Sequence, residues 1–450
     1  MKKTVRHKNA KSTPRATADA DTLLVGAAEV DITPPIGTAL CGSIWPRPSE
    51  GVLDPLTIKA VVLQSGGQRL AYVLFDLEGV LRKQGDAAVA LASARTGIPE
   101  QNIVWAASHT HSGPYLQPMF GPAPDVVDEK WLAELPGKFA DAVEAASKCM
   151  RPATMSLSRG YCLNVGHNRR LRYKDGREIN TCNLESEVGD GSTNEVQCLG
   201  SGGPVDPEVG MLCFDDERGH PIAILWHFTL HTSTDFGKCF TADYPAVVAA
   251  RLRERLGPGL VSIFMPGACG NICYQVASSH RIVGNALADA MIPELDKRKP
   301  RRAPMDLRSL KEDIVVPCRD FDVDQEARIQ SSGWSDSIKE VFREELKAVR
   351  EEGEREVRTV LQAWRIGDVG FVSLPGELFV EWGLKIKEES PFPWTFPVEL
   401  GGDYVGYMVT AQAWKTGGYE SLLGRGAKPS VEGVEMMVSR AQKLLARLWR

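Results

Sequence analysis

Two histidines stand two positions apart in the stretch ASHTHSGP, where they are His109 and His111. The run before them, NIVWAAS, is short, apolar and rich in β-branched and aromatic residues, which predicts a buried strand that ends at a Ser-Gly-Pro turn. In an extended chain, residues i and i+2 point to the same side, so we expect both imidazoles to face one spot at the end of this strand. Such a pair can hold a metal ion, or one ring can bind the ion while the other moves a proton. The alternative is two histidines that merely cap a turn.

A second pair of histidines, His227 and His231, occurs in LWHFTLHTST. Both would share one face of an extended strand, but four residues span about 13 Å, which is too far for two ligands of one ion unless the strand bends. His231 closes the apolar run beside three hydroxyl residues, which is a better place for an active site than the middle of a strand. We therefore expect His231 to belong to the site and His227 to be a core histidine of the sheet.

Several other polar residues follow predicted strands or lie in turns near these motifs. Glu377 comes directly after VGFVSLPG, so it is either a surface carboxylate of a Pro-Gly turn or a metal ligand. Asp76 of LFDLEG, Asp243 of TADYP and Asn271 of GACGN are either supports that orient ligands or turn residues, and we favour support.

Alternating strands and helices must position these residues. Helical periodicity predicts helices at residues 83–96, 129–150 and 244–256. Strands are expected in PIAILWHFTLH, GLVSIFMPGA, RTVLQAWRIG and VGFVSLPG, with hairpin turns at SGGQ and at Gly367-Asp368. The last helix has one apolar face, made of Val434, Met437, Val438, Ala441, Leu444, Leu445 and Leu448.

The expected fold class is mixed α/β, with β-sheets flanked by helices in one large catalytic domain and the site at strand ends. One turn-rich stretch, residues 189–203, could be an interdomain linker. We favour a long loop inside the domain, of the kind that forms a lid or contacts substrate.

Composition excludes several classes of function. At 450 residues, with 43% hydrophobic and 25% charged residues, the chain is typical of a globular protein with a large core. A net charge of -5 gives no electrostatic footprint for nucleic acid, and no apolar stretch approaches the roughly 18–20 residues that span a bilayer. We expect a small-molecule partner, no nucleic acid and no stable membrane insertion.

The N-terminal residues begin with positive charges but lack the apolar core of about 7–15 residues that a signal peptide needs. Residues 1–22 are therefore expected to be a disordered basic leader, and residues 23–450 one domain. The ten cysteines include no CxxC pair and are expected to be mostly reduced thiols. Both observations favour a cytoplasmic location.

A series of motifs in one order resembles the catalytic domain of the neutral, non-lysosomal ceramidase family, roughly over residues 24–425. The motifs are AEVDITPPIG, SHTHSGP, NRR, LHTST, GACGN, LPGE and DYVGY followed by GGYE. The resemblance implies one zinc ion and hydrolysis of an N-acyl amide. The family carries a further immunoglobulin-like domain after the catalytic one, whereas this chain ends soon after Tyr419 in one helix, so we expect a short form.

The resemblance also implies the roles of individual residues. It makes His109, His231, Glu377 and Tyr407 the zinc ligands. Two imidazoles and a carboxylate are a usual set for catalytic zinc, whereas a phenol is a less usual ligand because the metal must acidify it.

The same pattern assigns three other residues, His111, Arg169 and Tyr419, to the substrate carbonyl and its transition state. Nothing within the segment NRR itself decides between Arg169 and Arg170, and the family pattern favours Arg169.

Local sequence alone would instead indicate that Tyr407 is an aromatic residue packed in a strand.

The function that follows is a zinc-dependent hydrolase that cleaves a C–N amide bond. Zinc would lower the pKa of its bound water toward about 7, and the resulting hydroxide would attack the carbonyl carbon. His111, Arg169 and Tyr419 would donate hydrogen bonds to the oxyanion. Ceramide is one candidate substrate. The alternatives are hydrolysis of an ester, a lactone or another polar carbonyl compound, sugar-derived ones included, and a non-catalytic binding protein on the same scaffold.

Overall fold

The computed structural model describes residues 22–117, 126–181, 196–275, 278–301, 304–320, 325–332 and 334–450. The expected leader, residues 1–22, lies outside the described residues except for its last position, so it stays a prediction. The same holds for residues 189–195 of the expected loop. Among the described residues, no helix is long and apolar enough to cross a bilayer.

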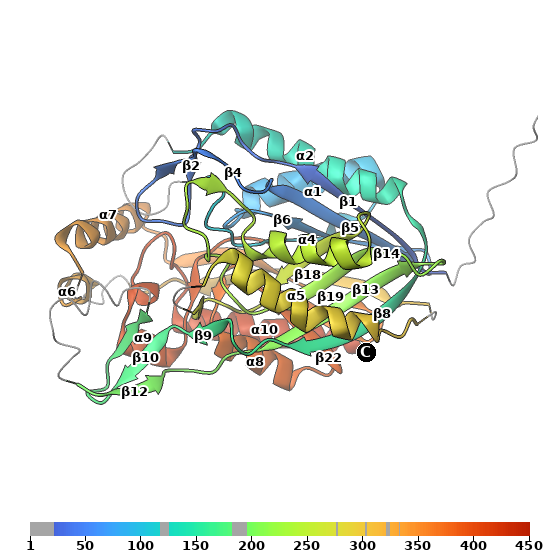
Figure 1. Cartoon of the computed structure of the whole chain (residues 1–450). Helices are drawn as coiled ribbons and strands as arrows, with labels where there is room; N and C mark the ends of the chain where they lie inside the picture. Colours follow the sequence, from blue (N-terminus) through green and yellow to red (C-terminus); the bar gives the residue numbers. More distant parts are fainter. Residues whose placement is uncertain are drawn as a thin grey trace, which may run out of the picture.

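The largest sheet has eight strands in the order β16-β14-β13-β8-β1-β5-β6-β7. Its outer pairs, β6–β7 and β14–β16, are parallel, and the other neighbours are antiparallel. Because β1 pairs with β8 only at Leu24 and Val25, the sheet divides there into two halves (Figure 1). The strands are β1 (Leu24–Asp31), β5 (Thr57–Ser65), β6 (Gln68–Phe75), β7 (Ile103–Ala107), β8 (Arg151–Tyr161), β13 (Glu208–Asp216), β14 (Pro221–Phe228) and β16 (Val261–Pro266).

A second sheet has four strands in the order β18-β19-β20-β22. They are β18 (Leu307–Pro317), β19 (Glu356–Ile366), β20 (Val369–Ser373) and β22 (Trp394–Val398). Trp364 of β19 stacks on Tyr72 of β6 with 5.9 Å between ring centroids, and on Phe371 of β20 at 5.1 Å. Both halves of the large sheet and the inner face of the small one therefore share one apolar core.

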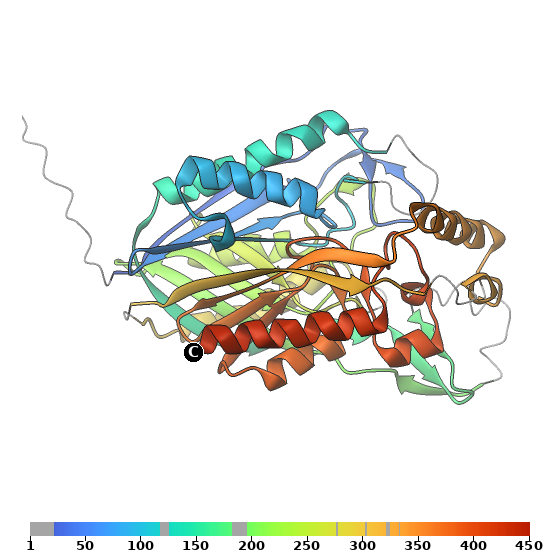
Figure 2. The same ribbon diagram turned by 180° about the vertical axis from the view of Figure 1, so that it is seen from behind.

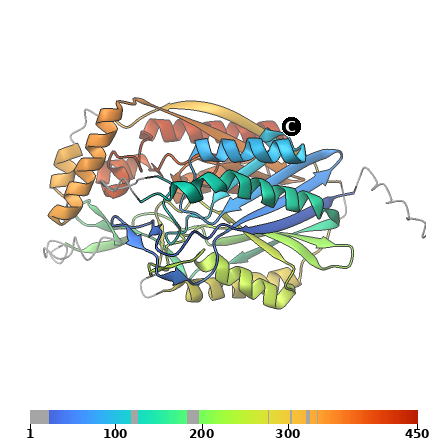
Figure 3. The same cartoon turned by 90° about the horizontal axis from the view of Figure 1, so that it is seen from above.

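Helices cover the outer faces of these sheets (Figures 1 and 2). α1 (Arg82–Thr96) and α2 (Glu129–Lys148) cover the half that contains β1 and β5, whereas α4 (Tyr244–Leu256) and α5 (His280–Asp296) cover the other half. α8 (Val380–Glu389) and α10 (Val431–Trp449) pack on the four-stranded sheet. α6 (Gln325–Gln330) and α7 (Asp336–Glu352) lie at the end of the molecule opposite the C terminus (Figure 3).

Short elements complete the molecule, most of them near α6 and α7 and one, η1, at the start of β7. They are β2 (Ala39–Leu40), β3 (Arg47–Pro48), β4 (Gly51–Val52), β9 (Gly166–Asn168), β10 (Arg170–Tyr173), β11 (Glu178–Asn180), β12 (Cys198–Ser201), β15 (Cys239–Phe240), β17 (Ile272–Tyr274), β21 (Glu377–Leu378), β23 (Tyr407–Met408) and α9 (Ala411–Thr416), with 3-10 turns η1 (Glu100–Asn102) and η3 (Tyr419–Ser421).

The mixed α/β class and the longer elements are confirmed. The helices expected at 83–96 and 244–256 match α1 and α4 to within one residue, and both hairpins form at the expected turns. The predicted apolar face of α10 is buried throughout, and the Ser430 side chain caps the helix by accepting a hydrogen bond from the Gly433 N–H.

Two expectations about element limits are wrong. The run PIAILWHFTLH is a strand only as far as Phe228, so His231 lies three residues beyond the end of β14. Residues 189–203 are not all loop, because Cys198–Ser201 form strand β12, which pairs with β10. A glycine-rich, exposed edge strand carries no apolar alternation that would reveal it.

Candidate metal centre and substrate pocket

The first pair of histidines follows β7 but is not extended. His109 has a φ of 68°, in the left-handed region that non-glycine residues rarely adopt. The turn is fixed because the His109 N–H donates to the Leu77 carbonyl (2.8 Å) and the His111 N–H to the Thr232 carbonyl (3.1 Å). The two Nε2 atoms lie 3.3 Å apart. The imidazoles therefore converge as expected, but a turn brings them together rather than the shared face of a strand.

His109, His231 and Glu377 form a nearly equilateral triangle of donor atoms. The two Nε2 atoms are 3.2 Å apart, and Oε2 of Glu377 lies 3.4 Å from that of His109 and 3.3 Å from that of His231. Three ligands of a tetrahedral zinc, with bonds of roughly 2.0–2.1 Å, are about 3.3–3.4 Å from one another. The triangle therefore has the dimensions of one face of such a site.

The protons on the three rings are fixed from outside the cluster. Each Nδ1 lies beside a backbone carbonyl oxygen, that of Glu78 for His109 (2.8 Å), of Gly42 for His111 (3.0 Å) and of Cys269 for His231 (2.8 Å). A carbonyl oxygen can only accept, so each Nδ1 carries a proton, and the Nε2 of each ring in its neutral form turns a lone pair toward the others. This is the arrangement of metal-binding histidines, whose outer nitrogen is oriented by a hydrogen bond.

The charges of the cluster also favour a cation. Burial disfavours the charged imidazole, but Glu377 outweighs it and raises the pKa of His109 to about 9. Burial would raise the pKa of Glu377, yet the adjacent His109 lowers it well below its usual value. Burial lowers the pKa of His231 to about 4. Among the described residues, the buried Oε2 of Glu377 has no polar partner apart from the imidazoles of His109 and His231, so the donor set fits a divalent ion that would bind this oxygen.

Tyr407 reaches the same place through a strand pair that is distant in sequence. β21 and β23 run parallel with Glu377 opposite Tyr407, and the Glu377 N–H donates to the Gly406 carbonyl at 3.0 Å. The Tyr407 hydroxyl lies 3.3 Å from that of Tyr419. Burial, reinforced by Glu377, raises the pKa of Tyr407, so its phenol is neutral in the absence of a metal.

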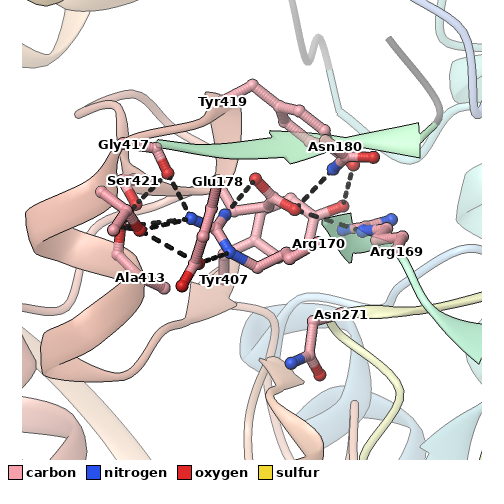
Figure 4. A network of polar contacts seen from close by, with 12 residues as sticks. Arg169, Arg170, Glu178, Asn180, Asn271, Tyr407, Ala413, Gly417, Tyr419 and Ser421 are labelled. Carbon is pink, nitrogen blue, oxygen red and sulfur yellow. Dashed lines mark hydrogen bonds and ion pairs between the residues drawn. The ribbon is translucent and has the colours of Figure 1, made fainter. Parts of the chain in front are cut away.

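Arg169 lines the cavity that holds the cluster, and Arg170 does not. Both arginines belong to the polar network drawn in Figure 4. The guanidinium carbon of Arg169 lies 5.4 Å from the ring centre of Tyr407 and 5.3 Å from that of Tyr419. Its Nε donates to Oε1 of the fully buried Glu420 at 3.1 Å. Arg170 points the other way, where it donates to Glu178 at 2.9 Å and to the Gly417 carbonyl at 2.7 Å. Successive residues of the chain here turn to opposite sides.

All seven residues assigned from the sequence line one cavity of about 340 Å³. Sequence reasoning missed several polar members of the lining, including Glu78 and Tyr404. Burial raises the pKa of Glu78 to about 7, and the Tyr404 hydroxyl donates to Oε1 of Glu377 at 2.8 Å. Sequence reasoning also missed the largely apolar side chains of the lining, several of which come from α7 and the residues before it. They are Ile44, Phe236, Tyr274, Trp334, Ile338 and Phe342. Tyr404 could have been found in the motif DYVGY, but apolar residues on one helix face look like core in any sequence.

The expected supports hold the segments that carry the site. Asn271 accepts the Arg169 N–H at its carbonyl (2.9 Å) and the Val380 N–H at its amide oxygen (2.8 Å). Asp243 caps α4 and accepts a hydrogen bond from Thr234, three residues after His231.

Of two further residues, His227 is placed as the sequence suggested, whereas the hydrogen bonds of the Asp76 side chain go to Thr57 and Lys59 rather than to a proposed ligand. Asp76 is fully buried, where it pairs with Lys59 and accepts from Thr57. His227 is a buried sheet histidine, with Nε2 2.8 Å from the Pro397 carbonyl oxygen. It takes no part in the cluster.

Comparison with known proteins relates the fold to solved ceramidases. No protein-family model matches the chain, and no curated protein sequence does. The crystal structure of neutral ceramidase from Pseudomonas aeruginosa matches with 18% identity and a TM-score of 0.69, over 96% of this chain and 75% of that one. A ceramidase complexed with C2 matches with 16% identity and a TM-score of 0.71, over 95% and 75% of the two chains. The chain therefore has the fold of these ceramidases, as the sequence motifs implied.

Proposed function

We propose that this protein is a zinc-dependent hydrolase that cleaves the C–N bond of an N-acyl amide. The observation that carries the proposal is the triangle of His109, His231 and Glu377, whose 3.2–3.4 Å edges suit a tetrahedral ion, within a cavity that also holds Arg169 and Tyr419. The fold shared with ceramidases supports the same reaction class.

Tyr407 is proposed as the fourth ligand, because it lies opposite Glu377 in the β21–β23 pair. A cluster of His109, His111 and His231 is the competing set, since their imidazole nitrogens lie within 4.8 Å of one another. We favour Glu377 over His111 because a carboxylate balances the ion's charge and its Oε2 has no other partner. Bound zinc would act as a Lewis acid on the carbonyl and lower the pKa of a water toward about 7.

The remaining polar residues handle the substrate. The family resemblance assigns His111 as a donor to the oxyanion; because its Nδ1 proton faces the Gly42 carbonyl at 3.0 Å, we propose instead that its Nε2 accepts a proton from the attacking water. The same proton then passes to the amide nitrogen, which leaves as an amine while water's oxygen joins the acid. Arg169 and Tyr419 donate hydrogen bonds to the carbonyl oxygen as its charge grows, and one such donor contributes on the order of 100-fold to turnover.

The apolar side chains at the rim of the cavity indicate that the substrate carries an apolar group. Phe236 faces the cavity from one segment, and Trp334, Ile338 and Phe342 face it from another. Apolar walls with a few polar groups at the base are typical of small-molecule sites. Ceramide is one candidate substrate. We favour smaller amides that are dissolved as monomers, and a cytoplasmic location for the protein.

The test combines metal analysis with a substrate panel. Purified protein is expected to contain about one zinc per chain and to hydrolyse N-acyl amides without detergent. A chelator should abolish the activity and added zinc should restore it. His109→Ala and His231→Ala are expected to lose the metal. Full zinc occupancy in the double variant would contradict the ligand assignment.

The panel includes matched esters, lactones and ceramide in micelles. Turnover of esters or lactones alone would favour the alternative hydrolase, and activity only on micelles would refute the preference for monomeric substrates. A metal-loaded protein that hydrolyses nothing in the panel would favour a binding protein.

A further inference from the structure

One buried arginine, Arg319, is not among the residues that line the pocket. It lies two residues after the end of β18 and is only 1% exposed. Its guanidinium donates four hydrogen bonds, all to backbone carbonyl oxygens: Tyr407 (3.0 Å), Glu420 (2.8 Å), Leu422 (2.9 Å) and Pro429 (3.1 Å). The planar fork of an arginine can serve several acceptors at fixed angles, which a lysine ammonium cannot.

Three of these carbonyls belong to the two segments that carry the pocket tyrosines. Tyr407 itself offers one, and Glu420 and Leu422 lie one and three residues after Tyr419. One rigid group is therefore bonded to both segments. The hydroxyls of the two tyrosines lie 3.3 Å apart, and their rings meet edge to face at 85°.

The two tyrosines differ in how firmly their own elements hold them. Tyr407 lies in β23, which is paired with β21. Tyr419 lies in the short turn η3, directly after Gly417 and Gly418, whose φ angles of 88° and 99° permit backbone conformations that other residues avoid. Two consecutive glycines leave this segment poorly determined by its own chain, so contacts from outside must fix it.

Burying a guanidinium costs free energy, and so does leaving the buried carbonyl oxygens that it bonds without a donor. Burial lowers the pKa of Arg319 to about 9. Removing its donors would leave buried carbonyls unpaired, each with the penalty of a desolvated acceptor. The segments would then move to find other partners. A shift of about 1 Å at a reacting group can cost on the order of 100-fold in rate.

We propose that Arg319 is a positioning residue that sets the separation of the Tyr407 and Tyr419 side chains, and through them the placement of substrate at the metal centre. The inference rests on the proposed hydrolase function for its kinetic consequence. It assigns a role to Arg319, which is not among the described residues that line the pocket.

The test compares Arg319→Lys with a matched variant far from the site, Arg365→Lys. Arg365 also donates to backbone carbonyls, those of Gly367 (2.8 Å) and Leu448 (2.9 Å), and also pairs with Asp306 at 3.2 Å. Both variants should lower the melting temperature. Only Arg319→Lys is expected to lower kcat, by about 10- to 100-fold, with KM changed less than about threefold.

Equal kcat in the two variants, at comparable losses of stability, would overturn the proposal, because Arg319 would then be a structural residue only. Should Arg319→Lys fail to fold, Trp414→Leu replaces it, since the Trp414 ring packs 5.6 Å from the Arg319 guanidinium without entering the pocket. A fall in kcat relative to Arg365→Lys, at a comparable loss of stability, is expected. Unchanged kcat would count against the proposal.

The result remains interpretable if the proposed function fails. If the wild type hydrolyses no amide or ester, zinc release to a chelator is measured instead, because the proposed ligand Tyr407 is held by Arg319. Release from Arg319→Lys at least about 10-fold faster than from Arg365→Lys supports the coupling. Equal release rates would contradict it.

Discussion

His109 and His111 are neighbours in one turn, yet their positions suit different tasks. His109 Nε2 lies on the donor triangle, 3.2 Å from that of His231 and 3.4 Å from Oε2 of Glu377. His111 Nε2 lies 3.3 Å from His109 Nε2 and is not a corner of this triangle. The proposed function makes His109 an ion ligand and His111 a residue that faces the substrate, and each can be removed on its own.

The first prediction is that His111→Ala keeps zinc but loses turnover by about two to three orders of magnitude, or roughly 2.7–4 kcal/mol of transition-state stabilisation. Tyr419→Phe should show a parallel loss. Elemental analysis and steady-state kinetics on the two single variants would decide it. A zinc-free His111→Ala protein would show that the three-histidine ligand set is correct.

The second prediction concerns Tyr404, whose hydroxyl orients Glu377 through a 2.8 Å hydrogen bond to Oε1. Tyr404→Phe is expected to weaken zinc binding by about 10- to 100-fold, as loss of a partner that orients a ligand usually does. Competition with a chromophoric chelator measures the change. Tyr72→Phe is the control, because Tyr72 is also buried but lies in the core beside Trp364. Equal affinities for the two variants would contradict the orienting role.

At this scale, sequence could identify residues but not their geometry. Local patterns placed His109, His111 and His231 near strand ends, since an apolar run that stops at polar residues is visible in sequence. Glu377 and Tyr407 needed the family resemblance, because the pairing of β21 with β23 joins residues 30 positions apart through two-residue strands. The left-handed φ of His109 has no sequence signal, since histidine does not require it.

At the scale of elements, predictability follows length and periodicity. α10 was predicted with its whole buried face because 19 residues repeat one apolar pattern, and the β19–β20 hairpin because a Gly-Asp turn separates two apolar runs. Most residues of the site, however, lie in short segments that follow long strands. Such segments are fixed by hydrogen bonds to distant chain, as the Tyr419 turn is by Arg319, and these contacts leave no local pattern.

The third prediction tests α7 as a wall of the substrate pocket. Phe342 faces the cavity and packs on Trp334 with 4.7 Å between ring centroids, whereas its neighbour Val341 is buried but does not line the cavity. Phe342→Ala is expected to lower kcat/KM about 10-fold for amides with a large apolar group and little for acetyl amides. Val341→Ala should lose stability without that selectivity. Equal losses on large and small substrates would remove α7 from the specificity assignment.

At the scale of the whole molecule, the metal centre joins parts of the chain that are far apart in sequence. His109 follows β7 in one half of the large sheet, His231 follows β14 in the other half, and Glu377 follows β20 of the four-stranded sheet. An ion bound by all three would crosslink both halves of the large sheet with the small sheet. Residues 23–450 are therefore proposed to behave as one domain whose stability depends on metal.

The fourth prediction follows from that crosslinking. At the proposed site, zinc would bind the folded chain and not the dispersed ligands of the unfolded chain. Free zinc at about 1,000 times its dissociation constant should therefore add roughly 4 kcal/mol to the free energy of unfolding. With an unfolding entropy of about 2.1 cal/mol/K per residue, this raises the melting temperature by about 4 °C for a chain of 450 residues. Differential scanning calorimetry of metal-free protein with and without zinc measures the shift. His109→Ala should abolish the shift, whereas His220→Ala, at an exposed position outside the site, should retain it. Two separate transitions, only one of which responds to zinc, would show that the metal centre stabilises a part of the chain rather than the whole.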